Sequence, residues 1–340
     1  MSSYALRDEN AIYFECDYGC DNAIFARINN ESFFITDGRY EIEARESVKA
    51  ELIISNELVK SLYELCKSKN VKEIVIDPKD WSLFDFLELE KLGLKTQYAK
   101  DFSKLKRIIK SPEERAKLKR ASELGARCFD EFASFINSLT KPISTKELFF
   151  HTSNIFRQNG ECELSFSPIV GVNANAAKSH ALPDDTMLNR GDLLLLDAGV
   201  RLNNYCSDRT RTSCFTDDGW SSDKLNNNFL DSKQKEVYSV VLKAQLEAIK
   251  AAKIGMKASD LDLVARTIIK DSGFGEFFIH SLGHGVGLDI HELPNISSRS
   301  DFILEEGMVF TIEPGVYLAN EFGIRIEDTI YLGKNGAEIL

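Results

Sequence analysis

The first third of the chain has short apolar runs that alternate with turns and helical segments. Residues 23–28 and 32–36 are apolar runs separated by Asn29-Asn30-Glu31, which predicts a β-hairpin. Residues 71–77, Val-Lys-Glu-Ile-Val-Ile-Asp, predict a buried strand that a proline ends. Because strands that alternate with helices form mixed or parallel sheets, we predict a small α/β domain over residues 1–110.

The pattern changes to helical spacing at Ser111-Pro112-Glu113-Glu114. Here a serine can cap the helix, a proline takes the first helical position, and a glutamate at the third position completes a capping box. Apolar residues at helical spacing continue to about Leu139, and a second helix is predicted from Ser144. We place a domain boundary at this helix start, so that the second domain covers residues 111–340.

Within the second domain, the pattern predicts strands first, then helices, then strands again. Residues 166–215 predict period-2 strands with Gly and Asn turns, and residues 308–331 again predict strands, around Glu313 and Glu327. Residues 216–231, called the 216–231 loop below, are polar and rich in turn residues, which predicts a surface loop. Helices are predicted over residues 232–253 and 259–272.

The composition and net charge of the chain disfavour two classes of function, nucleic-acid binding and membrane binding. With 43% hydrophobic and 28% charged residues, the 340-residue chain is typical of a globular protein of two domains. A net charge of -11 disfavours nucleic-acid binding, because phosphate groups require a basic surface. The chain has no run of eighteen apolar residues, and its first ten residues have no signal-peptide core. We therefore expect a cytoplasmic protein that does not bind membranes.

Three of the five histidines lie within residues 280–291, His-Ser-Leu-Gly-His-Gly-Val-Gly-Leu-Asp-Ile-His. The interleaved glycines predict a backbone that approaches another segment closely and imidazoles that converge. A zincin helix requires His-Glu-x-x-His on one helical face, and three glycines disfavour such a helix. A metal ion bound here therefore needs further ligands from other segments.

Asp197 and Asp208 form the first candidate pair of carboxylate ligands. If Asn203-Asn204 is the tip of a hairpin, Asp197 pairs with Thr210. Asp208 then lies diagonally on the same face, about 7 to 8 Å away along the backbone. Taken alone, such a pair is equally consistent with carboxylates that bind arginine or backbone amides.

Glu313 and Glu327 form a second pair, opposite each other across a hairpin whose midpoint is Asn320. Buried like charges at this separation would raise each other's pKa and destabilise the fold unless a cation lies between them. Together with His284, the two pairs suit Mn²⁺ or Co²⁺, with Zn²⁺ and Fe²⁺ as alternatives. Bridging carboxylates predict two metal ions about 3.5 to 4 Å apart.

These residues resemble the pita-bread metallopeptidases, and specifically the Xaa-Pro branch that contains aminopeptidase P and prolidase. The matching motifs are Leu-Asp197-Ala-Gly, Ser-Asp208-Arg-Thr-Arg-Thr, His280-Ser-Leu-Gly-His284-Gly-Val-Gly-Leu-Asp-Ile-His291-Glu, Thr-Ile-Glu313-Pro-Gly, Ile-Arg325-Ile-Glu327-Asp-Thr, Ile-Thr-Asp37-Gly-Arg-Tyr and Ile-Lys110-Ser-Pro-Glu-Glu. The resemblance covers nearly the whole chain. It implies an α/β fold with a small creatinase-like N-terminal domain, followed by a pita-bread catalytic domain.

The resemblance also implies a set of metal ligands and a reaction. The implied ligands of two divalent metal ions, with Mn²⁺ favoured, are Asp197, Asp208, His284, Glu313 and Glu327. Asp208 and Glu327 are expected to bridge the ions. The implied reaction is the attack of an activated water on the carbonyl before a proline, with Glu313 moving its proton.

Further residues are expected to contact the substrate. The resemblance implies that His180 and His291 stabilise the charge of the tetrahedral intermediate, while His280 lines the proline pocket. Arg325, two residues before Glu327 on a strand, faces the same side and can hold a carboxylate of the site, or serve only in charge balance. Two weaker candidates in substrate binding are Arg299, for a free substrate carboxylate, and Tyr317, for a wall of the proline pocket.

The sequence leaves three activities open. The first is an Xaa-Pro aminopeptidase, which releases the residue that precedes a proline at the second position of a peptide. The second is a prolidase that is restricted to dipeptides, and the third is a non-catalytic peptide-binding relative. The resemblance suggests a homodimer, although no residue establishes it.

Overall fold

The computed structural model describes residues 3–226 and 228–340 of the chain. It consists of two compact units, Met1–Arg107 and Ile108–Leu340. Residue 227, which belongs to the 216–231 loop, lies outside the described residues. In the described part of the chain, every helix is too short or too polar to cross a membrane.

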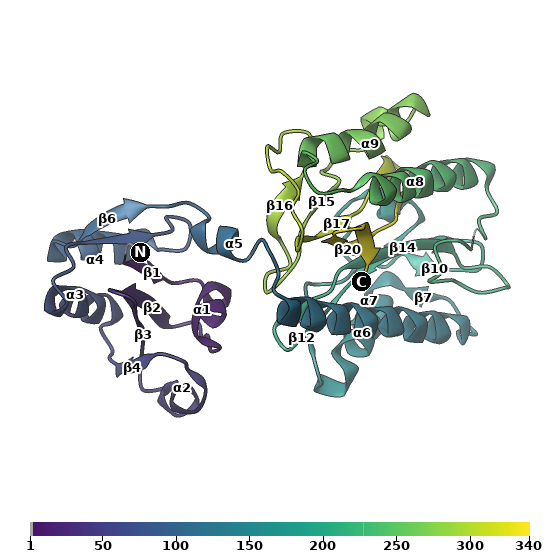
Figure 1. Cartoon of the computed structure of the whole chain (residues 1–340). Coiled ribbons are helices and arrows are strands. Elements are labelled where there is room, and N and C mark those ends of the chain that lie inside the picture. The colour runs from purple at the N-terminus through teal and green to yellow at the C-terminus, as the bar shows by residue number, and fades with distance from the viewer. Residues whose placement is uncertain (1–2, 227) are drawn as a thin grey trace. The chain divides into compact units, whose positions relative to one another are not determined.

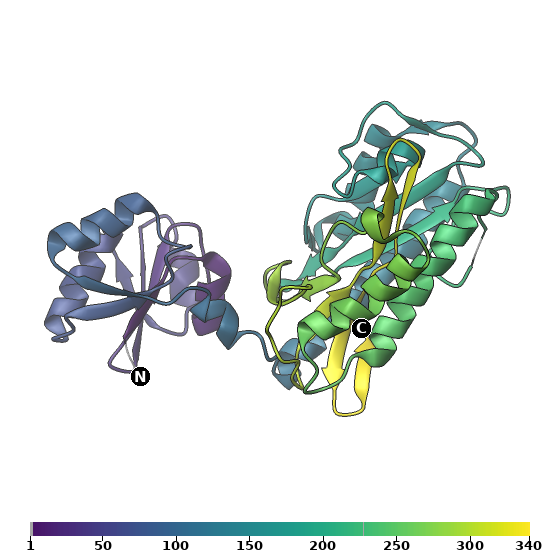
Figure 2. The same cartoon turned by 90° about the horizontal axis from the view of Figure 1, so that it is seen from above.

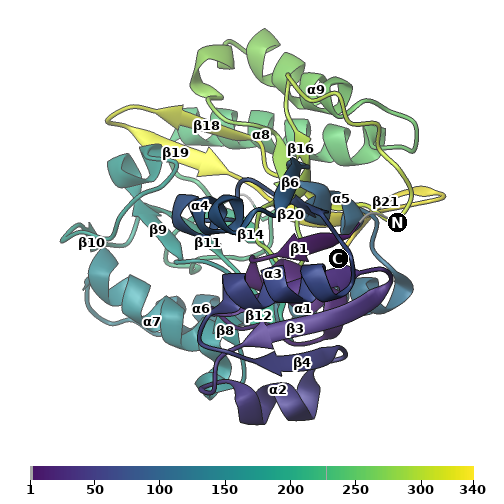
Figure 3. The same cartoon turned by 90° about the vertical axis from the view of Figure 1, so that its left-hand side faces the viewer.

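The first unit is built on a six-stranded sheet with the strand order β4-β3-β2-β1-β5-β6. The strands are β1 (Tyr4–Leu6), β2 (Ala23–Ile28), β3 (Glu31–Thr36), β4 (Glu51–Ile54), β5 (Glu73–Ile76) and β6 (Lys95–Tyr98). The helices are α1 (Glu9–Cys16), α2 (Glu41–Ser47), α3 (Leu58–Ser68), α4 (Leu83–Leu92) and α5 (Phe102–Lys106). Figure 3 shows this sheet with its helices. Apolar side chains of α3 and α4 pack on one face of the sheet, and those of α1 and α2 pack on the other.

The predicted hairpin in this unit is confirmed. Strands β2 and β3 are antiparallel, and both residues of the connecting turn, Asn29 and Asn30, have positive φ angles of 50° and 70°. A two-residue turn of this kind requires positive φ at both positions, which asparagine tolerates better than most residues. Strand β3 begins at Glu31, one residue earlier than predicted.

Four long helices of the second unit are confirmed with small shifts at their ends. They are α6 (Pro112–Asn137), α7 (Thr145–Arg157), α8 (Ser232–Ala251) and α9 (Ala258–Asp271). The capping box predicted at Ser111 is present, since Glu114 N donates to Ser111 Oγ at 3.2 Å and Ser111 N donates to Glu114 Oε2 at 2.9 Å. Ser144 caps α7 with a second capping box. Figure 2 shows α8 and α9 side by side.

The strands of the second unit are short and form several small sheets. They are β7 (Ile143–Ser144), β8 (Glu163–Leu164), β9 (Ile169–Val172), β10 (Met187–Leu188), β11 (Leu193–Ala198), β12 (Val200–Leu202), β13 (Tyr205–Cys206), β14 (Arg209–Cys214), β15 (Gly283–Gly285), β16 (Glu292–Ile296), β17 (Val309–Ile312), β18 (Gly315–Leu318), β19 (Phe322–Arg325), β20 (Asp328–Gly333) and β21 (Gly336–Ile339). Three short 3-10 helices, at residues 158–160, 173–177 and 275–277, complete the described elements. The mixture of helices and strands confirms the predicted α/β class.

The strands lie between two layers of helices, as Figure 1 shows for α8 and α9 on one side and α6 and α7 on the other. Strand β11 illustrates the reason, because successive side chains of a strand point to opposite faces. Leu193 and Leu195 belong to the apolar core that includes residues of α8 and α9. Leu194 and Leu196 belong to the core that includes residues of α6 and α7. Both faces of the strand are therefore buried, and its sequence is apolar throughout.

Both hairpin registers predicted for the carboxylate pairs are confirmed. Asp197 pairs with Thr210 between β11 and β14, and the turn residues Asn203 and Asn204 have φ angles of 49° and 69°. In the C-terminal hairpin, the pairs of β17 with β20 and of β18 with β19 share one register whose turn contains Asn320, with φ 64°. Matching registers on apolar strands place each carboxylate on a defined face.

The 216–231 loop differs from the prediction in one respect. Its described residues contain neither a helix nor a strand, as predicted. It is not a surface loop throughout, because Trp220 and Phe229 are buried. Trp220 Nε1 donates to Leu194 O at 3.1 Å, and the Asn137 side chain binds the Trp220 backbone. Aromatic side chains in a polar segment thus anchor the loop to the helical layer of α6 and to β11.

Candidate metal centre and active site

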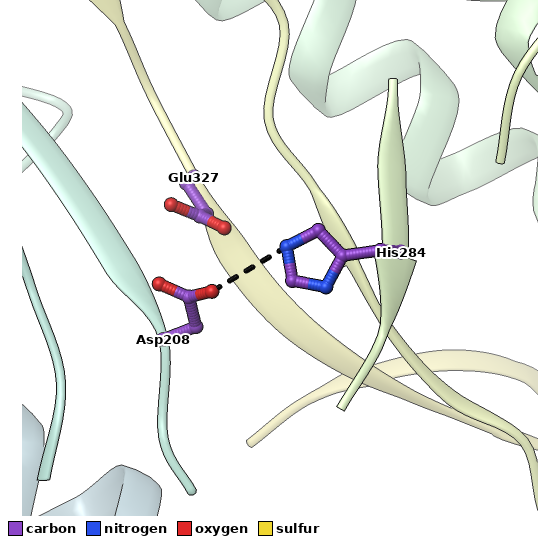
Figure 4. Close-up of side chains that lie close together, drawn as sticks. All are labelled: Asp208, His284 and Glu327. Atoms are coloured by element: carbon purple, nitrogen blue, oxygen red, sulfur yellow. Dashed lines mark ion pairs between the residues drawn. The ribbon is translucent and has the colours of Figure 1, made fainter. Parts of the chain in front are cut away.

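Asp208, His284 and Glu327 converge in the second unit from three separate strands. Asp208 directly precedes β14, His284 lies in β15, and Glu327 directly precedes β20. One ligand atom of each residue lies within 4.8 Å of the other two. Figure 4 shows the three side chains pointing toward one another, with His284 Nε2 3.6 Å from Asp208 Oδ2. The fold therefore brings together three of the predicted ligands.

The two remaining predicted ligands lie beside this group. Asp197 lies in β11, and Glu313 directly follows β17 with its Oε1 atom 3.4 Å from His284 Nε2. All five predicted ligands line one cavity of about 570 Å³. The same cavity is lined by the predicted substrate-contacting residues His180, His280, His291 and Arg325.

The glycines around His284 are required by close approach of the backbone, as the sequence indicated. A Cβ atom at Gly283 would lie 2.0 Å from Thr311 O, and one at Gly287 would lie 2.4 Å from the Glu292 carboxylate. A side chain at either position would therefore displace the strand that carries His284 or the turn that follows it. Small residues here allow β15 to lie directly against the Glu313 segment.

The His284 imidazole presents a lone pair to the carboxylates. Its Nδ1 atom is 3.0 Å from Gly285 O, and because a carbonyl oxygen only accepts, Nδ1 carries the proton. Burial lowers the pKa of His284, which favours the neutral ring. Nε2 is then an acceptor that faces Asp208 and Glu313, which are acceptors too. A cation between these atoms would resolve the repulsion, as in metal-bound histidines that donate their other ring N–H to a carbonyl.

The charge balance of the cavity also fits divalent cations. Four carboxylates, three of them buried and that of Glu313 partly exposed, face one guanidinium, that of Arg325, which binds Asp197 Oδ2. Burial, together with the neighbouring carboxylates, raises the pKa of Asp208 and Glu327 well above their ordinary values. Burial raises the pKa of Glu313 to about 7. Unlike an isolated ion pair, this cluster carries an excess of negative charge that bound cations would stabilise.

Two carboxylate oxygens point to the same conclusion. Among the described residues, Asp197 Oδ1 and Glu327 Oε1 are buried atoms without a hydrogen-bond partner. Buried carboxylate oxygens are normally hydrogen-bonded, so an orphaned pair in a shared cavity marks places for a ligand. Oxygen donors with one imidazole suit hard or borderline divalent metal ions. The residues present therefore fit the metal site that the sequence predicts.

Two threonines for which the sequence predicts no role in the site each donate a hydrogen bond to a carboxylate oxygen of a predicted ligand. Thr210 Oγ1 donates to Glu327 Oε2 at 2.6 Å, and Thr311 Oγ1 donates to Glu313 Oε1 at 3.1 Å. Thr311 lies two residues before Glu313, so strand periodicity placed it on the same face. The contact of Thr210 with Glu327 could not be read from the sequence, because 116 residues lie between them.

His280, Tyr317 and Arg325 form one hydrogen-bonded chain at the edge of the site. Arg325 Nη1 donates to the Tyr317 hydroxyl at 2.7 Å, and that hydroxyl lies 2.9 Å from His280 Nε2. His280 Nδ1 is 2.8 Å from Ser281 O, so Nδ1 is protonated and Nε2 accepts from Tyr317. Burial lowers the pKa of His280 to about 4 and raises that of Tyr317 to about 12, which keeps both side chains neutral.

The other predicted substrate residues differ in position. The ring of His291 packs against that of His284, with centroids 4.3 Å apart. Arg299 is an exposed residue after β16 and is not among the residues that line the cavity, so its contact with a substrate carboxylate stays a prediction without support from this cavity. The cavity also has an apolar wall that the sequence analysis missed, formed by Phe166, Ile169, Leu182 and Ile290. Phe166, Ile169 and Leu182 belong to none of the quoted motifs, and Ile290 lies within the His280–His291 stretch, where no pattern assigned it a role.

A buried ion pair fixes the turn between His284 and His291. Lys110 Nζ binds Glu292 Oε2 at 2.5 Å, and both side chains are 1% exposed. Glu292 Oε1 accepts hydrogen bonds from the backbone of Leu288 at 3.1 Å and of Asp289 at 3.2 Å. The carboxylate thereby holds the backbone that leads into His291, and Lys110 neutralises it.

Comparison with known proteins agrees with this geometry. Residues 116–334 match the sequence pattern of metallopeptidase family M24. An Xaa-Pro dipeptidase of Pyrococcus furiosus is 35% identical over 298 residues, which cover 82% of this chain and 81% of that protein. The chain belongs to metallopeptidase family M24. The resemblance stated from the motifs is confirmed, and so is the prediction of an enzyme of the metallopeptidase class.

Solved structures extend the M24 comparison to the whole chain. An X-Pro aminopeptidase from Thermotoga maritima is 32% identical, with a TM-score of 0.87, and the match covers 100% of this chain and 95% of that one. An Xaa-Pro dipeptidase from Bacillus anthracis is 27% identical, with a TM-score of 0.90 and coverage of 99% and 92%. The fold class predicted from the sequence is that of the M24 enzymes. Divalent metal ions are implied for a member of this family that carries the Asp208, His284 and Glu327 cluster.

Replacement of Lys110 tests the buried ion pair. We expect Lys110→Met to lower the free energy of unfolding by about 3 to 5 kcal/mol, because it removes the ammonium group from a buried carboxylate. The measurement is urea unfolding followed by circular dichroism. Lys146→Met is the matched control, since Lys146 forms an exposed pair with Asp185, and it should cost less than about 1 kcal/mol. Equal losses in the two variants would contradict the role of the Lys110–Glu292 pair.

The shifted pKa of His280 predicts a pH dependence of stability. An unfolded histidine titrates near about pH 6.5, whereas folded His280 titrates at about 4. Between these values the unfolded chain binds more protons, so the stability that neutral His280 contributes is complete above about pH 6.5 and falls as the pH drops toward about 4. In chelated protein, the unfolding free energy of wild type should therefore fall relative to that of His280→Gln from about pH 7 to about pH 5. His151→Gln, on α7 outside the cavity, is the control. Parallel curves of unfolding free energy against pH for wild type and His280→Gln would refute the lowered pKa of His280.

Proposed function

We propose that the chain is a metal-dependent Xaa-Pro peptidase that hydrolyses the bond between an N-terminal residue and a following proline. The observation that carries this proposal is the convergence of five ligand side chains in one cavity, where Asp197 Oδ1 and Glu327 Oε1 are buried without partners. Membership of family M24 supports it, and so do the names of the relatives, which are Xaa-Pro dipeptidases and an X-Pro aminopeptidase.

Two divalent metal ions, with Mn²⁺ favoured over Co²⁺, Zn²⁺ and Fe²⁺, are proposed for this site. The residues that would hold them are Asp197, Asp208, His284, Glu313 and Glu327, and the short separations of Asp208, His284 and Glu327 support this set. When bound, such ions activate water at neutral pH and polarise a carbonyl oxygen.

Glu313 is proposed as the residue that accepts and returns the proton. The Thr311 hydroxyl fixes the orientation of its carboxylate, and its Oε1 atom lies 3.4 Å from His284 Nε2 in the cavity, where a carboxylate can act as a general base. His180 and His291 line the same cavity and are proposed to donate to the oxygen on which charge develops. Because proline has a tertiary amide and a fixed φ, its ring requires a shaped pocket, for which His280 is the proposed wall. Tyr317 is not among the residues that line the cavity, so its part as a wall stays a prediction, and it contacts His280 from behind through its hydroxyl group.

Arg325 is proposed to hold the orientation of Asp197 and of the Tyr317–His280 chain. Its guanidinium donates to Asp197 Oδ2, Tyr317 Oη and Thr210 Oγ1, and it is 3% exposed. A guanidinium that satisfies several acceptors in fixed directions suits such a role better than a lysine would. A homodimer is proposed from the resemblance, with a peptide as the only other partner.

A dipeptidase restricted to Xaa-Pro is the second candidate, favoured by the name of the 35% identical Pyrococcus relative. The deciding assay compares an Xaa-Pro dipeptide with an Xaa-Pro-Xaa tripeptide, each with Mn²⁺ and after chelation. Release of the first residue of the tripeptide, lost on chelation and restored by metal, is the expected result for an aminopeptidase. Cleavage of the dipeptide alone indicates the dipeptidase. Cleavage of neither peptide by protein with metal bound would refute a peptidase and favour a binding module.

Replacement of the proposed proton carrier gives a further prediction. Glu313→Gln should lower kcat by at least about 100-fold, because the amide accepts no proton, and a positioned base contributes about 10² to 10⁴-fold. Steady-state kinetics with the cleaved peptide provides the measurement. Glu321→Gln, an exposed residue of the same hairpin that pairs with Lys233, should leave kcat within a factor of about two. A Glu313→Gln protein with wild-type kcat would exclude Glu313 from proton transfer.

A further inference from the structure

Asp328, the residue directly after the proposed ligand Glu327, has a buried carboxylate that binds groups from three segments. It is 1% exposed. Its Oδ1 atom accepts from Arg211 Nη2 at 2.6 Å, and its Oδ2 atom accepts from Gln245 Nε2 at 2.7 Å and from Lys224 Nζ. The lysine belongs to the 216–231 loop, so this loop supplies a charged group to the interior beside the metal site.

Lys224 is held in this position by several contacts. Its ammonium group also donates to Gln245 Oε1 at 3.1 Å, and its backbone oxygen accepts from the Tyr238 hydroxyl of α8 at 2.7 Å. Burial of Trp220 and Phe229 anchors the loop on either side of it. The side chain is 13% exposed, which is unusual for a lysine in a loop and indicates a built contact.

Arg211 connects Asp328 to the backbone of Glu327. Its Nη1 atom donates to Glu327 O at 2.6 Å and to Thr210 O at 2.9 Å, while Nη2 binds Asp328. Its Nε atom donates to Ser222 O of the 216–231 loop at 3.0 Å. One guanidinium thus contacts the loop, the Asp328 carboxylate and the backbone of the proposed metal ligand Glu327.

We propose that Lys224 is a positioning residue for Glu327. Its ammonium group holds Asp328 Oδ2, which leaves Oδ1 facing Arg211, and Arg211 in turn fixes the Glu327 backbone. The Glu327 side chain then keeps Oε2 on Thr210 and presents Oε1 to the metal site. The 216–231 loop therefore supports the metal centre from the side opposite the cavity, although none of the loop's described residues lines the cavity. This inference rests on the metal site proposed above.

The test is the binding of Mn²⁺ to chelated, full-length protein, measured by titration calorimetry, with thermal unfolding of the metal-free protein recorded alongside. Lys224→Met should raise the Mn²⁺ dissociation constant by about 10-fold or more, since loss of groups that orient metal ligands costs about 10 to 100-fold in affinity. Lys224→Gln retains a hydrogen-bond donor for Asp328 and should raise the Mn²⁺ dissociation constant by less. If Lys224→Met does not fold, the dissociation constant of Lys224→Gln tests the proposal instead. Lys233→Met is the matched control, because Lys233 pairs with Glu321 on the surface.

The outcomes separate the inference from the proposal on which it rests. A folded Lys224 variant that melts at a lower temperature but binds Mn²⁺ within twofold of wild type would show that Lys224 only anchors the loop. Tighter binding would show that its charge merely repels the cations, and would also overturn the inference. A wild-type protein that binds none of Mn²⁺, Co²⁺, Zn²⁺ and Fe²⁺ would overturn the metal site itself.

Discussion

Convergence of four largely buried carboxylates in one cavity is the constraint on which the rest of the second unit depends. Their mutual repulsion disfavours the metal-free fold, so the surrounding structure must hold them in place by other means. Arg325, Thr210 and Thr311 each donate to one carboxylate oxygen, and apolar strands covered by helices on both sides supply the burial. Bound metal ions would relieve this repulsion, so the free energy that it costs in the metal-free fold would strengthen metal binding.

The histidines of the site illustrate how burial selects one protonation state. In both His284 and His280, Nδ1 donates to a backbone carbonyl within the same glycine-rich stretch, so that Nε2 remains an acceptor. Burial also lowers the pKa of both rings, which favours the neutral form of each. His284 Nε2 faces carboxylates and His280 Nε2 faces a tyrosine, yet both rings carry the proton on Nδ1. The backbone carbonyl that accepts from Nδ1, rather than the group that faces Nε2, therefore sets the tautomer.

Much of the site could be predicted because the residues of a β-hairpin pair symmetrically about its turn. Asn203-Asn204 and Asn320 mark turns with positive φ, and counting outward from them gives the observed pairing of Asp197 with Thr210 and the shared register around Glu313 and Glu327. The contacts of Lys224, Lys110 and the apolar cavity wall were not predictable, because they join segments whose proximity only the complete fold defines. The polar composition of the 216–231 loop predicts a surface loop, because turn-rich polar segments are normally exposed, whereas Trp220 and Phe229 within it are buried.

The C-terminal hairpin has one further consequence, which concerns chain length. A single register runs from residue 309 to residue 331 and passes through both Glu313 and Glu327, although the exposed turn at Asn320 lies seven residues from each. A residue inserted within one strand, between the turn and Glu313 or Glu327, would put the two carboxylates out of register and direct one of them to the opposite face. The two strands of this hairpin must therefore keep equal lengths on either side of the turn. The 216–231 loop is under no such constraint, because it joins a strand to a helix and its length leaves both registers unchanged.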